Sequence, residues 1–202
     1  MVEMMGYERY KAFVTGPYQA GKTHLIHALD PNAISIERPI RRGNGNGGGT
    51  TTTCFDLGRV VWLSDGRQEL LVPRSEYQTR KDEFEGWKVR EVELRGVPGS
   101  LQFRSVRDAM RNGTDVVLFV VDSSDPSMVS DAKKIMDETR AAHNGTHIQV
   151  VASKQDANNA APPEEVARWL GVDDAIGFSV TDVDLCKRII IDTLRKIEKD
   201  GG

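Results

Sequence analysis

The chain contains the octapeptide Gly16-Pro17-Tyr18-Gln19-Ala20-Gly21-Lys22-Thr23, which follows the pattern G-x-x-x-x-G-K-T. An apolar, strand-prone run at residues 10–15 precedes it, and apolar residues at helical spacing, Leu25, Ile26 and Leu29, follow it. A strand, a glycine loop and a helix in this order aim several backbone N–H groups, and the positive end of the helix, at one point. The octapeptide therefore predicts a loop that binds a polyphosphate.

Single positions in this phosphate loop have separate expected roles. Gly16 and Gly21 allow the tight backbone, and Lys22 is expected to reach the β- and γ-phosphates. The hydroxyl of Thr23 is expected to take one coordination position on Mg²⁺. The predicted nucleotide-contacting residues of this segment are completed by Gln19, Ala20 and His24.

The composition limits the class of protein. With 202 residues, the chain is expected to form one α/β domain, residues 1–202, with a sizeable core. The 27 Lys and Arg residues nearly balance the 30 Asp and Glu residues, so the basic footprint of a duplex-DNA-binding protein is missing and we expect no nucleic-acid partner. Cys54 and Cys186 lie far apart in sequence, which argues against a zinc site or a disulfide framework.

Targeting and membrane signals are missing from the sequence. It has no apolar run of about 18 residues or more, and its first residues lack the pattern of a signal peptide. Neither end carries a lipidation motif. We therefore expect a soluble, cytoplasmic protein with no membrane anchor of its own.

Strand-like and helix-like segments alternate along the rest of the chain. Strands are predicted at residues 54–63, 87–94, 115–122, 147–152 and 175–180, and helices at 100–111, 128–142, 162–170 and 183–197. The first two of these strands are expected to form an antiparallel pair at the edge of the sheet. The order of elements predicts a three-layer α/β fold of the P-loop NTPase type, with a mainly parallel sheet and one antiparallel edge strand.

Two segments do not fit this alternation. Residues 38–53 include the glycine-dense run 43–49, which has a large ordering entropy, so we expect it to be mobile unless a ligand or partner holds it. Residues 65–86 separate the strands predicted at 54–63 and 87–94 and are long for a hairpin connection. They form either an extended hairpin or a surface insertion.

A second group of polar residues follows the strand at 147–152. Lys154 and Asp156 resemble the N-K-x-D pattern of guanine-nucleotide-binding proteins. The pattern implies that the carboxylate of Asp156 accepts hydrogen bonds from N1–H and the 2-amino group of guanine together, while the stem of Lys154 covers the ring; adenine lacks that pair of donors. Ser153 precedes them. The later residues Ser179, Val180 and Thr181 stand where guanine-nucleotide-binding proteins have an S-A-K-type loop, and this resemblance implies that they offer backbone N–H groups to guanine O6.

With these motifs in this order, residues 11–198 resemble the Ras-like small GTPases, and most closely the prokaryotic MglA-like and archaeal Rag/Arf-like branch. The similar segments are Thr51-Thr52, Asp56-Leu57-Gly58, Gly96-Val97-Pro98-Gly99, Phe119-Val120-Val121-Asp122-Ser123 and Lys154-Gln155-Asp156. The resemblance implies binding of GTP and GDP with Mg²⁺. It also implies a switch that meets activating factors, exchange factors and effectors through two loops. Ser153 stands where the family has Asn, and we expect it to weaken the link to the phosphate loop.

The resemblance also assigns the two switch loops. Thr52, four residues before Asp56, corresponds to the threonine that closes on Mg²⁺ in switch I, with its neighbours at 51 and 53 as alternatives. In switch II the family pattern D-x-x-G-Q becomes Gly96-Val97-Pro98-Gly99-Ser100, so the aspartate of the Mg²⁺ shell is missing. Gly99 can still donate its N–H to the γ-phosphate.

The candidate catalytic residues are Ser100, which is too short to orient the attacking water, and Gln102, which substitutes only if the following helix starts late. We therefore expect slow intrinsic GTP hydrolysis that needs a group from a partner. Two other functions stay open: a pseudo-GTPase scaffold that holds nucleotide without turnover, and a P-loop kinase or ATPase.

Overall fold

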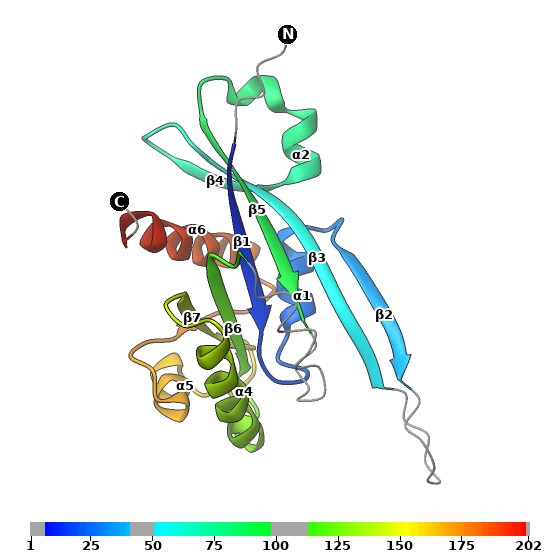
Figure 1. Cartoon of the computed structure of the whole chain (residues 1–202), viewed down its shortest axis with the longest axis vertical. Coiled ribbons are helices and arrows are strands. Elements are labelled where there is room, and N and C mark those ends of the chain that lie inside the picture. The colour runs from blue at the N-terminus through cyan, green and yellow to red at the C-terminus, as the bar shows by residue number, and fades with distance from the viewer. Residues whose placement is uncertain (1–6, 41–50, 98–112, 201–202) are drawn as a thin grey trace.

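The computed structural model describes residues 7–40, 51–97 and 113–200 (Figure 1). Within them the strands form an eight-stranded sheet of order β2-β3-β5-β1-β6-β7-β8, with β4 paired to β3. The strands are β1 (Glu8–Thr15), β2 (Ile34–Ile40), β3 (Thr51–Ser64), β4 (Glu69–Pro73), β5 (Lys88–Gly96), β6 (Val116–Asp122), β7 (His147–Ser153) and β8 (Ile176–Gly177). The helices are α1 (Lys22–Leu29), α2 (Arg74–Thr79), α4 (Val129–Ala142), α5 (Pro163–Leu170) and α6 (Val183–Asp200), with 3₁₀ turns η1 (Lys81–Phe84) and η3 (Pro126–Met128).

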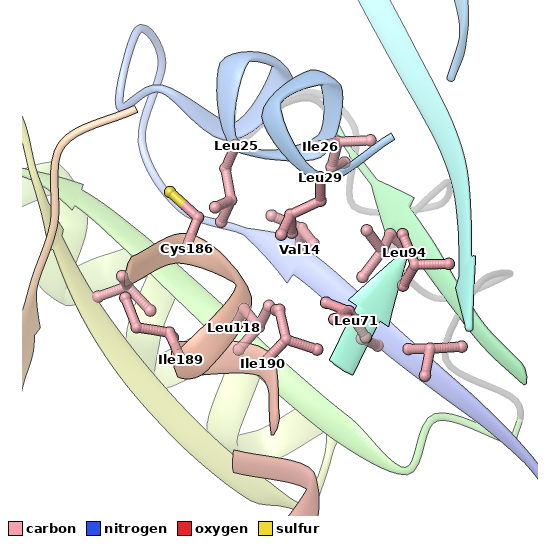
Figure 2. Close-up of a cluster of buried hydrophobic side chains, with 14 of the residues drawn as sticks. Val14, Leu25, Ile26, Leu29, Leu71, Leu94, Leu118, Cys186, Ile189 and Ile190 are labelled. Atoms are coloured by element: carbon pink, nitrogen blue, oxygen red, sulfur yellow. The ribbon is translucent and has the colours of Figure 1, made fainter. Parts of the chain in front are cut away.

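The predicted three-layer α/β fold is confirmed. β5, β1, β6, β7 and β8 run parallel to one another, and β6 is buried along its whole length between β1 and β7. Side chains of α1 and α6 pack on one face of the sheet around Val14, Leu94 and Leu118, as Figure 2 shows. A second cluster joins α4 and α5 to the opposite face of β6 and β7.

The antiparallel strand does not lie at the edge of the sheet, contrary to the sequence-based expectation. β3 is antiparallel to β5 as predicted, but its outer side is covered by β2 along its first half and by β4 along its second half. β2 was not predicted, and its Pro39 is compatible with an edge strand because proline has no N–H to donate. The terminal strand is shorter than predicted, with only Ile176–Gly177 in the ladder.

Residues 65–86 form a compact addition to the sheet. A tight turn at 65–68 leads into β4, and α2 and η1 follow. Tyr77 and Phe84 pack against Val61, Leu63 and Val72 in a small core of their own. This core lies on the face of β3 opposite α1 and α6, whereas Leu71 of β4 packs into the main core on the α1 and α6 face.

A polar cluster fastens the carboxy-terminal helix to the sheet. The guanidinium of Arg90 lies 4.0 Å from the ring centre of Trp62, and its Nε donates to Glu198 Oε1 at 2.6 Å. The hydroxyl of Tyr10 also donates to Glu198, at 3.0 Å. Burial and the hydrogen bond to Glu198 raise the pKa of Tyr10 to about 12.

None of the helices within the described residues has the length and apolar character needed to cross a membrane.

Candidate functional site

The phosphate loop has the backbone that its glycines predict. It runs from the end of β1 to Lys22, the first residue of α1, with φ of 132° at Gly16 and 92° at Gly21. A Cβ on Gly16 would lie 2.0 Å from the carbonyl oxygen of Val120 on β6. Gln19 also has a positive φ, of 58°. Glycine at position 16 is therefore required both by conformation and by the close approach of the neighbouring strand.

Lys22 is held inside this loop. Its Nζ donates to the carbonyl oxygens of Gly16 at 3.0 Å and Pro17 at 2.5 Å, and the residue is only 9% exposed. Burial lowers the pKa of Lys22 to about 8, although the nearby carboxylate of Asp56 opposes the shift. The ammonium thus sits within the ring of backbone that surrounds the predicted phosphate position.

A carboxylate that the sequence analysis did not identify lies beside Thr23. The Oδ2 of Asp56 accepts from Thr23 Oγ1 at 2.7 Å, and its Oδ1 accepts from Ser35 Oγ at 2.5 Å, which also contacts His27 Nε2 at 2.8 Å. Asp56 on β3 pairs with Gly96 on β5. A Cβ at Gly96 would lie 3.0 Å from the Cβ of Asp56. The glycine that replaces the family aspartate in sequence therefore leaves room for an aspartate from the adjacent strand.

The hydroxyl of Ser153 joins the end of β7 to the phosphate loop. Its Oγ lies 2.7 Å from the carbonyl oxygen of Ala20 and 3.0 Å from that of Val121. Serine at this position therefore keeps a link to the phosphate loop, because the hydroxyl is close enough to donate to Ala20 directly; its strength relative to the family's Asn stays a prediction. The short side chain suffices since the loop approaches β7 closely: a Cβ at Gly21 would lie 3.7 Å from the side chain of Ser153.

Lys154 follows in a left-handed conformation, with φ of 60°, and its ammonium forms an ion pair with Asp122 at the end of β6. Burial raises the pKa of Asp122, but hydrogen bonds from Lys154 and Ser124 outweigh it, so the carboxyl has a pKa below its ordinary value. The ion pair fixes the aliphatic stem of Lys154 at the carboxyl end of the sheet.

The third loop lies against the second. The N–H of Gln155 donates to the carbonyl oxygen of Phe178 at 3.2 Å, while Asp156 is exposed. The hydroxyls of Ser179 and Thr181 lie 2.8 Å apart, which gives the loop around Val180 a defined turn. The phosphate loop, Lys154 to Asp156, and Ser179 to Thr181 thus follow β1, β7 and β8, at the same end of the parallel sheet.

Four of the predicted site residues are not placed with the others. Gly99, Ser100 and Gln102 lie outside the described residues, as do the predicted helix at 100–111 and the glycine run at 43–49. The backbone of Thr52 lies in β3 opposite Pro39, but its side chain is outside the description.

In the described part of the chain no three or more His, Cys, Asp or Glu side chains are grouped to hold a metal ion. The hydroxyl of Thr23 and the carboxylate of Asp56 are hard oxygen donors of the type that Mg²⁺ prefers.

A mainly parallel sheet whose first strand leads through G-x-x-x-x-G-K-T into a helix defines the P-loop NTPase fold. The family model of the ADP-ribosylation factors matches residues 60–197, about two thirds of the chain. The chain belongs to this family, known as Arf, and is a small GTP-binding protein of the switch type. The match begins within β3, so the phosphate loop precedes the matched residues. No curated protein matches the chain.

Proposed function

We propose that this protein binds GTP and GDP together with Mg²⁺, hydrolyses GTP slowly, and depends on an activating partner for turnover. The observation that carries the proposal is the hydrogen bond from Ser153 to Ala20, because it joins the guanine-type loop to the phosphate loop at one end of the sheet. A single nucleotide then reaches both loops. We also propose that, among small GTPases, the chain is most similar to the MglA-like and Rag/Arf-like branch, as the run Gly96-Val97-Pro98-Gly99 favours.

The phosphate tail is expected to be held by the loop and by Lys22. Backbone N–H groups of Gln19, Ala20, Gly21 and the following turn up to His24 lie at the start of α1, and we expect them to bind an anion at its positive end. The N–H of Ala20, which lies 3.4 Å from the carbonyl oxygen of Pro17, would turn to the anion instead. Lys22 is expected to exchange one carbonyl partner for a β- or γ-phosphate oxygen. That exchange is favourable because a buried ammonium gains an anionic partner instead of a neutral one.

Thr23 and Asp56 fit a magnesium site. Thr23 Oγ1 would bind the ion directly, and Asp56 would accept a hydrogen bond from a water bound to the ion. In relatives with D-x-x-G the aspartate of that pattern has this role, and Gly96 stands at its position here. Thr52 would close the site in the GTP state. The bound ion neutralises charge on the β- and γ-phosphates. Ser35 holds the second oxygen of Asp56, so the carboxylate is oriented before metal arrives.

Asp156 is expected to read the guanine edge, with Lys154 along the ring and the N–H groups of Ser179, Val180 and Thr181 near O6. The test is competition between GTP and ATP for the purified protein, in which GTP should win by a wide margin. The variant Asp156→Asn should shift preference toward xanthosine nucleotides, because its amide donates where the carboxylate accepts. Equal binding of GTP and ATP by the wild type contradicts the proposal.

Slow hydrolysis is expected because Ser100 replaces the water-orienting glutamine, with Gln102 as the remaining candidate and Gly99 supplying only a backbone N–H. Single-turnover hydrolysis of GTP tests this. A rate equal to that of small GTPases with a complete switch II is incompatible with it.

The departures in switch II also favour a second candidate, a pseudo-GTPase scaffold that keeps nucleotide without turnover. Nucleotide content after purification, followed by a turnover assay, distinguishes the two. Asp56 favours the active switch, because it supplies the carboxylate that Gly96 lacks. A P-loop kinase or ATPase is the least supported alternative. We further propose that residues 1–202 act as one domain in the cytoplasm, with 38–53 as an extended switch I.

A further inference from the structure

The face of the sheet opposite α1 and α6 carries a groove beside α2. Its floor is formed by β3, β5 and β1. In the strand register Arg59 lies opposite Glu93, and Glu93 lies opposite Lys11. Arg74, the first residue of α2, forms one wall, and the volume is about 220 Å³. Because Arg74 belongs to the addition at residues 65–86, this addition supplies part of a surface cleft and is more than an extension of a hairpin.

This groove is basic, although the chain as a whole has a net charge of −3. Glu91 lies between Arg9, at 3.4 Å, and Arg74, at 3.6 Å, and Glu93 is held by Arg95 at 2.5 Å. Both carboxylates of the floor are thus already paired. Within residues 7–40, 51–97 and 113–200, the side-chain cations of Lys11 and Arg59 form no ion pair, although the backbone N–H of each donates to a carboxylate, that of Asp115 and of Asp30.

The groove continues into an apolar hollow of about 170 Å³ that shares Arg59 and Arg74 as lining residues. Its apolar side chains are Ile34, which is 59% exposed, and Leu57, its partner across β2 and β3. Ile36, next on the same face of β2, is 51% exposed. Large aliphatic side chains gathered on a surface mark an interaction site more often than isolated ones do.

We propose that this groove binds an extended acidic segment of a partner protein. Leu57 and Arg59 lie on one face of β3, two residues apart, which is about 6–7 Å. An extended peptide repeats its side chains at that same interval. A segment with an aliphatic residue followed two positions later by an acid would place the first over Ile34 and Leu57 and the second on Arg59. Lys11 lies across β5 from Arg59, and its charge would attract a further acid of the segment.

The chemistry of the groove favours a peptide over other anionic partners. A nucleic-acid backbone has no aliphatic group to place over Ile34 and Leu57. A bilayer surface is flat, whereas the cations lie along a cleft walled by α2. The inference does not depend on nucleotide binding, because the groove lies on the face of β3 opposite α1.

The test uses the full-length protein and fluorescence anisotropy of a labelled peptide in which one leucine is followed at alternate positions by two glutamates. The wild type should bind this peptide, more weakly as salt rises. Arg59→Glu should weaken binding by about tenfold, since an attraction becomes a repulsion. Arg67→Glu is the matched control, because it makes the same charge change in the exposed turn that faces α6 and should leave binding unchanged.

Binding of GDP, measured in parallel, should be the same for Arg59→Glu and the wild type, which separates this inference from the proposed function. The inference is overturned by a wild type that does not bind the peptide, or by an Arg59→Glu variant that binds it equally well. It is also overturned if duplex DNA or phosphatidylserine vesicles bind more tightly than the peptide and depend on Arg59.

Discussion

Asp56 is the residue whose replacement tests the metal site most directly. The change to Asn keeps the size of the side chain and an oxygen that accepts from Thr23 or Ser35, which lie 2.7 and 2.5 Å from the carboxylate, but it removes the negative charge. We therefore expect the fold to survive. Only the electrostatic contribution of the carboxylate to the ion beside Thr23 should be lost.

The magnitude follows from the geometry. Thr23 Oγ1 and Asp56 Oδ2 lie 2.7 Å apart, so an ion about 2.1 Å from Thr23 Oγ1 would lie within about 5 Å of the carboxylate, a distance that one water molecule can bridge. Groups in this position typically change metal affinity by about 10- to 100-fold, or roughly 1.4–2.7 kcal/mol. Coulomb attraction between a divalent ion and a carboxylate about 4 Å apart is on the order of 2 kcal/mol even in bulk water. The lower end of the range is therefore a minimum.

The assay is the release rate of a fluorescent GDP analogue as a function of Mg²⁺ concentration. Asp56→Asn should need about 10- to 100-fold more Mg²⁺ to retain the nucleotide, whereas Asp131→Asn, the same change on the exposed face of α4, should behave as the wild type. Gly96→Asp alone should be unstable, because its Cβ would lie 2.7 Å from Ile26 and 3.0 Å from Asp56. An unchanged Mg²⁺ dependence in Asp56→Asn refutes the assignment.

Three further predictions concern the loop and the core. Gly16→Ala should lower the free energy of unfolding by more than about 3 kcal/mol, measured by thermal denaturation, because its Cβ would lie 2.0 Å from the backbone of β6. Ser153→Ala should speed nucleotide release by about fivefold, since one hydrogen bond to Ala20 is worth about 1 kcal/mol; an unchanged rate speaks against the link. Tyr10 has a folded-state pKa of about 12, above its unfolded value, so its stabilisation is complete below pH 10 and is lost as pH rises from there toward 12. Denaturant unfolding across that range should show a shallower decline for Tyr10→Phe, and parallel curves would contradict the role of Glu198 as its partner.

Much of the site could be predicted from short stretches of sequence, because each of its loops is local. The phosphate loop needs only the order strand, glycines and helix, and Lys154 and Asp156 need only a buried strand before them. The same holds for β6, whose unbroken apolar run from Val116 to Asp122 is the mark of a strand covered on both faces. These features depend on backbone conformation and burial, which neighbouring residues determine.

The role of Asp56 was not predictable in that way. It is 40 positions from Gly96 in the chain, and only the antiparallel register of β3 on β5 places the two opposite each other. A slip of one residue would turn Asp56 to the other face of the sheet and away from Thr23. The sequence shows that β5 has Gly96 where the family has aspartate, and the pairing of β3 with β5 places Asp56 beside that position.

The sequence by itself determined the fold class and the glycine loop between the first strand and its helix, since these follow from local periodicity and spacing. The residues suited to guanine stay a prediction. The tertiary structure alone decided that β2 is the edge strand, that Ser153 reaches Ala20, and that α2 forms the wall of a basic groove with Arg59. The physical reason is that register and packing bring together residues that are distant in the chain. The free energy of those contacts depends on their distances in the folded protein, to the nearest ångström, and a linear pattern does not contain those distances.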